Sequence, residues 1–134
     1  MGNLTRNFSN SEFACRGKCN DDCKASSMNP KFMEKLQALR ELVGRPIKIT
    51  SGIRCSYYNT TIPGAAQHSW HIPRNGIACA ADIRTGSTKE DILTLYAAAD
   101  HLGFLGIGLY AGRIHVDMRP TQRARWVDKS WEWS

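Results

Sequence analysis

The change in hydrophobic period after Gly44 constrains the fold more than any other feature. Apolar side chains in residues 30–43 recur at helical spacing, and Asn29 before Pro30 supplies an N-cap and a first helical residue. Directly afterwards, residues 47–51 alternate between apolar and polar side chains, which predicts a strand that ends in a turn. The sequence therefore predicts an amphipathic helix that is followed closely by a strand.

Three later segments extend this pattern. "IACAADIR" (residues 77–84) predicts a second short strand, and "GIGLYAGRIHVDMR" (residues 106–119) predicts a glycine-punctuated strand or hairpin. Between them a helix begins at a cap on Ser87, with Glu90 three positions later completing a capping box. Residues 58–76 read as a long ordered loop, and such loops in compact domains are usually functional. The order of elements predicts a small α+β domain.

The chain has the length of one domain, which we divide into a cysteine-containing amino-terminal segment (1–27), a core (28–126) and a basic, aromatic tail (127–134). We expect no membrane span and no secretory signal, because the sequence has neither a long apolar run nor a charged n-region before an apolar stretch. The net charge of +6 suits an anionic partner such as nucleic acid, a lipid headgroup or a cell-wall polymer. A solvated basic face without a partner is the alternative.

The five cysteines cannot all pair within one chain. Cys15, Cys19 and Cys23 are spaced at four residues, wider than the usual gap in a zinc knuckle, so both a structural zinc and disulfides remain open there. Cys55 and Cys79 flank the long loop, and we expect that they can lie near one another.

A cluster of polar side chains is expected around the last predicted strand. In "RIHVD" side chains alternate, so Arg113, His115 and Asp117 share one face of the strand. If Asp82 ends a neighbouring strand, and His71 precedes it on the loop, two imidazoles and one carboxylate converge as in an open zinc site. Such a site leaves one position for water and lowers the pKa of that water. The alternatives are a surface histidine, a turn-forming aspartate, and pairing of Asp117 with nearby arginines.

The motifs "ITSGIR", "YN", "PGAA", "SWH", "GIACAADI", "GIGLY", "RIHVDMR" and "RARW" occur in the order found in a known family. The chain resembles zinc peptidases of the D-Ala-D-Ala carboxypeptidase and L-alanyl-D-glutamate endopeptidase family, which includes many phage endolysins, from about Phe13 to Trp126. The resemblance implies the zinc fold shared with lysostaphin-type peptidases and the hedgehog signalling domain. In that fold a small antiparallel sheet carries the ligands, and helices pack on one side.

The resemblance also implies roles for individual residues. His71, Asp82 and His115 would bind Zn²⁺, and Arg54 would bind the substrate carbonyl or carboxylate and stabilise the oxyanion. Ser69 and Tyr110, which lie in matching motifs, are further candidates for substrate binding.

The chain departs from the family pattern at two points. The pattern S-x-H-x-x-G-x-A-x-D separates histidine and aspartate by seven positions, whereas His71 and Asp82 are eleven apart. His68 is therefore an alternative ligand, although Ser69 stands where the pattern asks relative to His71. Many relatives carry a general-base carboxylate at the position that Gly112 occupies here. Asp117 then remains as a candidate base, or as a residue that orients a ligand.

These observations predict a monomeric zinc peptidase that hydrolyses amide bonds in peptidoglycan stem peptides, with no nucleic-acid or membrane partner. A phage endolysin or virion-associated lysin, made in the host cytoplasm and acting at the cell wall or periplasm, fits the expected lack of a secretory signal. The main alternative is a non-catalytic binding module or viral structural protein that keeps the zinc fold. Nucleic-acid binding through Trp126, Trp131 and Trp133, which stand among basic residues, is a third hypothesis.

Overall fold

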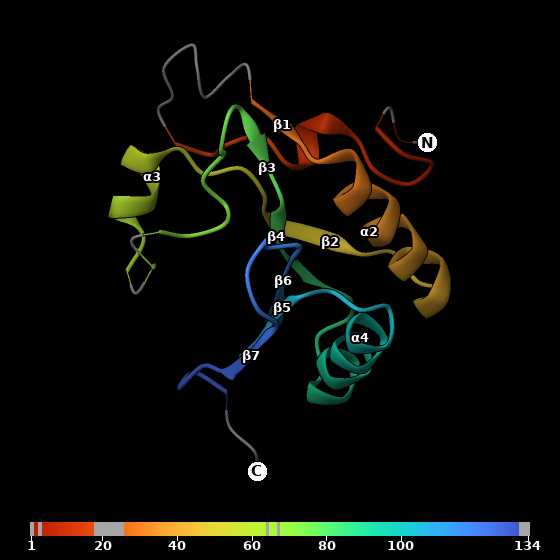
Figure 1. The fold of residues 1–134 in the computed structure, drawn as a ribbon. Helices are drawn as coiled ribbons and strands as arrows, with labels where there is room; N and C mark the ends of the chain where they lie inside the picture. Colours follow the sequence, from red (N-terminus) through yellow and green to blue (C-terminus); the bar gives the residue numbers. More distant parts are fainter. Residues whose placement is uncertain (1, 3, 18–25, 64, 67, 132–134) are drawn as a thin grey trace.

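The computed structural model describes residues 2, 4–17, 26–63, 65–66 and 68–131 (Figure 1). Its centre is a five-stranded sheet with the order β2-β4-β6-β5-β7, and β1 and β3 form a separate two-stranded sheet. In chain order the elements are η1 (Asn10–Glu12), β1 (Ser27–Met28), α2 (Pro30–Val43), β2 (Lys48–Ser51), α3 (Ser56–Thr61), β3 (Ile77–Ala78), β4 (Ala80–Arg84), α4 (Lys89–His101), β5 (Gly106–Tyr110), β6 (Arg113–Asp117) and β7 (Ala124–Val127).

The α+β class predicted from the sequence is confirmed, but the central sheet is mixed rather than wholly antiparallel. The pairs β2·β4, β4·β6 and β5·β6 are antiparallel, whereas β5 and β7 run parallel. Both edges of β6 are already occupied by β4 and β5, so the chain that leaves β6 pairs with the outer edge of β5 instead. Because β7 turns back against the direction of β6, it lies parallel to β5.

The helix predicted over residues 30–43 is present with the expected boundaries. The side chain of Asn29 accepts a hydrogen bond from the backbone N–H of Phe32, and Pro30 occupies the first turn. Gly44 ends the helix in the left-handed region, at φ +68°, where its N–H donates to the carbonyl of Arg40.

The second long helix begins one residue later than predicted. Thr88, not Ser87, is the N-cap of α4, and Asp91, not Glu90, completes the capping box. The Asp91 carboxylate accepts hydrogen bonds from the N–H groups of Ser87 and Thr88, while the Thr88 hydroxyl accepts from the N–H of Asp91. A single carboxylate thus satisfies two successive donors, which Glu90 does not do here.

The segment before β4 contains more regular structure than the sequence indicated. Residues 58–76 are not all loop, because α3 extends into them as far as Thr61. Residues 77–84 form two strands in different sheets instead of one strand. Asn75 and Gly76, both at positive φ, make a tight turn, and β3 then pairs in parallel with β1. This turn and strand lie within the interval between His71 and Asp82, which is longer than in the family pattern.

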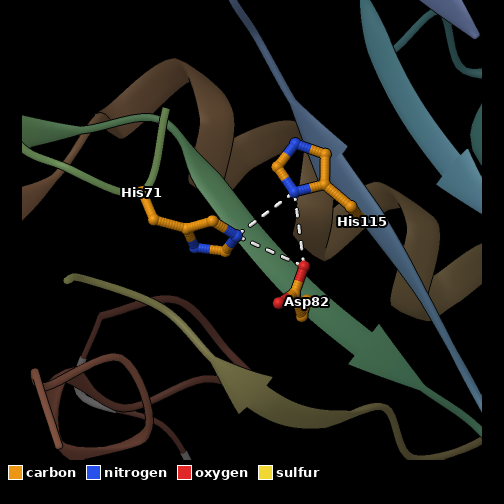
Figure 2. A group of neighbouring side chains, drawn as sticks. All are labelled: His71, Asp82 and His115. Carbon is orange, nitrogen blue, oxygen red and sulfur yellow. Dashed lines mark hydrogen bonds and ion pairs between the residues drawn. The ribbon is translucent and has the colours of Figure 1, made fainter. Parts of the chain in front are cut away.

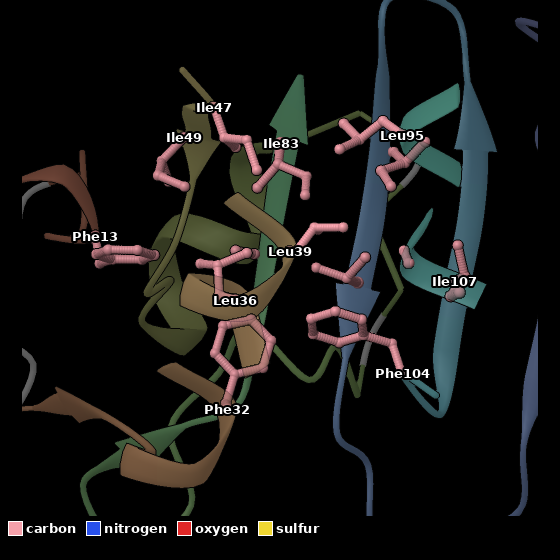
Figure 3. Close-up of a cluster of buried hydrophobic side chains, with 14 of the residues drawn as sticks. Phe13, Phe32, Leu36, Leu39, Ile47, Ile49, Ile83, Leu95, Phe104 and Ile107 are labelled. Carbon is pink, nitrogen blue, oxygen red and sulfur yellow. The ribbon is translucent and has the colours of Figure 1, made fainter. Parts of the chain in front are cut away.

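The main core lies between the sheet and the pair α2 and α4, which contact each other side by side (Figures 1 and 3). Leu36 and Leu39 of α2 and Leu95 of α4 are fully buried there. Phe8 and Phe13 belong to the same core, so the amino-terminal segment packs with the remainder of the domain. Among the described residues no helix is long and apolar enough to cross a bilayer.

Candidate metal centre and active site

One row of residues crosses all five strands of the central sheet and carries two of the predicted ligands. Asp82 of β4 is the direct cross-strand partner of His115 of β6, and the register continues to Ser51 on one side and to Gly108 and Trp126 on the other. Side chains alternate along each strand, so this row faces away from the core that Ile83, Ile114 and Val116 enter. The sheet thus holds a carboxylate and an imidazole side by side on its open face.

His71 completes the cluster from the loop before β3, as Figure 2 shows. Nε2 of His71 lies 3.2 Å from Oδ1 of Asp82 and 3.2 Å from Nδ1 of His115. Nδ1 of His115 lies 3.3 Å from the same Oδ1. The structure therefore brings together the three residues predicted as ligands, and all three are buried. His68 is exposed and is not part of the cluster.

The outward nitrogen of each imidazole is held by an acceptor. Nδ1 of His71 lies 2.7 Å from the carbonyl oxygen of Gly52, which can only accept, so this nitrogen carries the proton. Nε2 of His115 lies 2.7 Å from Oδ2 of Asp117 and donates to it. These bonds fix the rings with Nε2 of His71 and Nδ1 of His115 turned toward Asp82. Metal-binding histidines characteristically have outer partners of this kind.

Nε2 of His71, Nδ1 of His115 and Oδ1 of Asp82 face one another and bring three possible hydrogen-bond acceptors close together. Burial lowers the pKa of His71, so its Nε2 carries no proton near neutral pH. Although burial opposes ionisation of Asp82, the two histidines hold its pKa well below the usual value, and it is a carboxylate. Burial by itself lowers the pKa of His115, but hydrogen bonds with Asp117 and Asp82 outweigh it and raise that pKa. The pocket therefore favours one positive charge at its centre, which either a proton or a metal ion can supply.

The spacing of these donors suits a tetrahedral ion. Zinc bonds to nitrogen and oxygen of about 2.0–2.1 Å at tetrahedral angles place neighbouring donors about 3.3–3.4 Å apart. The observed distances between donor atoms, 3.2, 3.2 and 3.3 Å, are close to that value without rearrangement of the side chains. Two imidazoles and one carboxylate can thus hold a divalent ion and leave a position open toward the cavity.

Comparison with known proteins agrees with this geometry. The sequence model of a family described as Peptidase M15 matches residues 6–117. The chain belongs to the M15 peptidase family. A comparison with curated proteins finds no match.

In this M15 peptidase, the predicted oxyanion residue Arg54 is hydrogen-bonded to Asp82, one of the three candidate ligands. Its Nη2 donates to Oδ2 of Asp82 at 2.8 Å, and its Nε donates to Oγ of Ser51 at 3.1 Å. The side chain is almost fully buried but lines the cavity. Arg54 therefore holds the oxygen of Asp82 that faces away from the histidines, and only part of its guanidinium is left for a substrate.

Asp117 lies on the far side of His115 from His71 and Asp82. It is completely buried, and Arg119 holds it with three side-chain hydrogen bonds between 2.7 and 3.2 Å. Although burial raises its pKa, hydrogen bonds from His115 and Arg119 lower it to far below the usual range. A general base must reach the water that it deprotonates. These contacts hold Asp117 in the position that suits the second role expected for it, orientation of His115.

Ser69 and Tyr110, the two further residues suggested for substrate binding, both line the cavity and form hydrogen bonds with neighbouring residues. The Ser69 hydroxyl accepts a hydrogen bond from the N–H of His71 at 3.2 Å, which fixes the turn that presents the imidazole. Tyr110 lines the cavity, and its hydroxyl accepts from the indole nitrogen of Trp126 at 2.9 Å. Gly112 sits in the turn between β5 and β6, at φ +78°, and lines a separate depression.

Sequence reasoning missed several residues that build the site. Trp126 packs on the ring of His115 at 5.2 Å between centroids, and Gly108 leaves the space for it, since a Cβ there would lie 2.4 Å from the indole. Gly106 likewise leaves room for the carboxylate of Asp117. Two glycines on the same face of one strand are the sequence signal that could have revealed these close approaches.

The loop that carries His71 is clamped by an arginine that the sequence did not single out. Arg74 donates to the carbonyl oxygens of His68, Ser69 and Ile72 at 2.8 to 3.2 Å. Its guanidinium also stacks on Trp70, 3.9 Å from the ring centroid. These contacts replace regular secondary structure in holding the imidazole in place.

Three of the five cysteines, Cys15, Cys55 and Cys79, lie within the described residues. Cys55 lies beside Cys15, with 3.9 Å between the sulfur atoms, and the N–H of Cys55 donates to the sulfur of Cys15. The neighbour predicted for Cys55 was Cys79 instead. Cys19 and Cys23 lie outside the described residues, as does Trp133 of the tail.

The cluster opens into a cavity of about 480 Å³. Its lining includes Trp70, Tyr110 and Trp126 together with four basic side chains, those of Arg54, Arg113, Arg119 and Lys129. Among the described residues the lining carboxylates are Asp82 and Asp128. The cavity is thus a cationic, aromatic cleft with the three ligand candidates on its floor.

Proposed function

We propose that this peptidase uses Zn²⁺ bound by His71, Asp82 and His115 to hydrolyse amide bonds in the stem peptides of peptidoglycan. The observation that carries the proposal is the convergence of three buried donor atoms at 3.2 to 3.3 Å on the floor of an open cavity. Family membership supports the peptidase chemistry, and the resemblance to cell-wall peptidases supports the substrate.

The chain's own residues divide the remaining tasks. A bound zinc ion supplies a Lewis acid and lowers the pKa of water at its open position. Arg54 orients Asp82, and its remaining donors assist in holding the substrate oxygen. Asp117 fixes the tautomer of His115. Asp128, the lining carboxylate outside the ligand set, is the proton acceptor in this proposal.

The charge of the chain supports a cell-wall substrate. A protein with a net charge of +6 is attracted to walls rich in anionic polymers, and that attraction weakens as salt screens it. We propose that the protein is a phage endolysin or virion-associated lysin and that it acts as a monomer. It would be made in the host cytoplasm and delivered to the wall or periplasm. Lysis of permeabilised cells should then decline with ionic strength.

Mass spectrometry of muropeptides after incubation with zinc-loaded protein tests the proposal. The expected result is a pair of new fragments that arise from hydrolysis of one amide bond in the stem peptide. His71→Ala should lose zinc, measured by elemental analysis, and activity together, while His68→Ala serves as the matched control that keeps both.

Two outcomes would contradict the proposal in different ways. Loss of zinc from His68→Ala but not from His71→Ala would transfer the ligand role to His68. One tightly bound zinc with intact muropeptides would favour the alternative, a non-catalytic binding module or structural protein. That alternative is supported by the placement of Asp117, because its buried carboxylate is already engaged by His115 and Arg119.

A further inference from the structure

The amino-terminal segment and the segment that follows β2 meet at a pair of cysteines. Sγ of Cys15 lies 3.9 Å from Sγ of Cys55, although the two residues are 40 positions apart in the chain. Neither of the two lines the cavity, and both are partly buried against the core. The pair is therefore a feature of the fold that the proposed hydrolysis does not use.

Backbone contacts hold the two segments together beside this pair. The N–H of Ile53 donates to the carbonyl oxygen of Phe13 at 2.8 Å. Gly52 allows the close approach, because a Cβ there would lie 2.7 Å from Cα of Phe13. Each cysteine stands two residues after the hydrogen-bonded residue of its own segment. The sulfur atoms of Cys15 and Cys55 thus stay near each other as long as these backbone contacts persist.

Hydrogen bonds also fix the direction of the two sulfur atoms. The N–H of Cys55 donates to Sγ of Cys15 at 3.4 Å, and the N–H of Tyr58 donates to Sγ of Cys55 at 3.4 Å. An S–S bond is about 2.05 Å long, so the sulfur atoms must approach by roughly 1.9 Å to form one. Rotation of the side chains about their Cα–Cβ bonds can supply a movement of that size.

A metal ion is the other partner that two cysteine sulfurs can share. A structural zinc site needs four protein ligands. Within the described part of the chain, the one group of three or more potential ligands is His71, Asp82 and His115, so no third ligand of this kind joins the two sulfurs there. The described contacts therefore favour a covalent bond between the cysteines over a shared metal ion.

We propose that Cys15 and Cys55 form a disulfide under oxidising conditions, with a small-molecule disulfide such as oxidised glutathione as the oxidant. The thiolate of one cysteine attacks the oxidant, breaks its S–S bond and releases one thiol. The second cysteine then attacks the mixed disulfide and releases the other thiol. One S–S bond is broken and one is formed, the two protein sulfurs are oxidised, and their protons end on the two released thiols.

The disulfide would secure the segment that supports two of the candidate metal ligands. The carbonyl oxygen of Gly52 accepts from Nδ1 of His71 at 2.7 Å, and the N–H of Arg54 donates to the carbonyl oxygen of His71 at 2.9 Å. The guanidinium of Arg54 also donates to Asp82. Oxidation ties this segment to the amino-terminal segment, so it should stabilise the support of His71 together with the fold.

The delivery proposed above would take the cysteine pair from a reducing to an oxidising environment. Disulfides are rare in the cytoplasm and persist in the periplasm and at cell surfaces. On this view, which rests on the proposed function, the pair stays reduced where the protein is made and is oxidised where it acts.

Peptide mapping of the full-length protein after oxidation by glutathione disulfide tests the proposal. Remaining thiols are blocked before digestion, and trypsin then places Cys15 on residues 7–16 and Cys55 on residues 55–74. The expected product is a linked pair of these two peptides that a reducing agent separates. Oxidation should also raise the urea midpoint of unfolding by about 1–3 M, because a link between residues 40 positions apart restricts the unfolded chain.

Cysteine variants identify the partners. Cys55→Ser should lose both the linked peptides and the rise in the urea midpoint, whereas Cys79→Ser is the matched control that keeps both. Cys19 and Cys23 fall together on another tryptic peptide, residues 19–24, so a link from either one is distinguished from the proposed link.

Cys15→Ser is the second, independent variant and should behave as Cys55→Ser does. Absence of the linked peptides, a link from residues 19–24 to either cysteine of the pair, or an unchanged urea midpoint after oxidation would overturn the inference. A second bound zinc ion that Cys55→Ser removes, measured by elemental analysis, would overturn it as well. These measurements do not depend on hydrolysis, so intact muropeptides would defeat the proposed function and leave the disulfide standing.

Discussion

Replacement of Asp117 by Asn tests how the structure prepares His115 for a metal. Both carboxylate oxygens of Asp117 accept hydrogen bonds, Oδ2 from His115 and Arg119 and Oδ1 from the N–H and Nε of Arg119. Either orientation of an Asn amide places an NH₂ group against donors. If that NH₂ donates to Nε2 of His115, the imidazole proton moves to Nδ1, the atom turned toward Asp82.

The magnitude follows from these contacts. Loss of a partner that orients a ligating histidine typically costs about 10-fold to 100-fold in metal affinity, or about 1.4–2.7 kcal/mol. Asp117 is also fully buried and ion-paired, so the metal-free variant should unfold more easily. We expect about 3 kcal/mol, the lower part of the range for breaking a buried pair, because Arg119 keeps some contact with solvent.

Competition with a chromophoric zinc chelator gives the affinity, urea denaturation of the metal-free protein gives the stability, and turnover is measured at saturating zinc. Weakened zinc binding with turnover largely restored by excess zinc is the expected result. Unchanged affinity with a loss of about 100-fold to 10,000-fold in turnover would instead identify Asp117 as the general base and refute our reasoning from its burial.

Three further predictions concern other parts of the site and fold. Asp128→Asn should lower turnover by about 100-fold or more at saturating zinc while leaving zinc affinity unchanged; normal turnover would remove Asp128 as proton acceptor. Gly106→Ala should weaken zinc binding, because its Cβ would lie 2.3 Å from the carboxylate of Asp117, and an unaltered affinity in chelator competition would show that this approach can relax. Thr88→Ala should destabilise the protein by about 1 kcal/mol in urea denaturation and Ser87→Ala by much less; equal effects would contradict the observed cap.

Local periodicity predicted the strand that carries His115 and placed Asp82 in a strand, although residues 77–84 form two strands instead of one. The alternation in residues 113–117 placed His115 and Asp117 on one face, and the structure has that arrangement on β6. Asn29, Pro30 and Gly44 likewise identified both ends of α2, since capping depends on residues next to each other in the chain. Capping can be predicted from a single sequence because the interacting groups are close together along the chain.

The function of Asp117 depends on contacts that periodicity does not encode. A shared strand face permits Asp117 either to approach a water molecule or to hold His115, and only the imidazole's orientation decides between them. The orientation of the His115 imidazole depends on Asp117, on its own strand, and on Trp126, which comes from a separate strand. Long-range pairing also explains why β7 went unpredicted, because its parallel partner β5 precedes it by a hairpin and a loop.

The three donor residues are held by different parts of the fold, and this difference should affect the rate at which a bound ion exchanges. Asp82 and His115 are adjacent partners in the interior of the central sheet, whereas His71 sits on a loop held by Arg74 and by the carbonyl of Gly52. Local openings of a folded protein occur most easily in such loops and least easily in central strands. Exchange of a bound ion should therefore proceed by release of His71, with the other two donors still in register. The sheet then fixes two of the three donor atoms, and the exchange rate of the ion depends on the loop that carries His71.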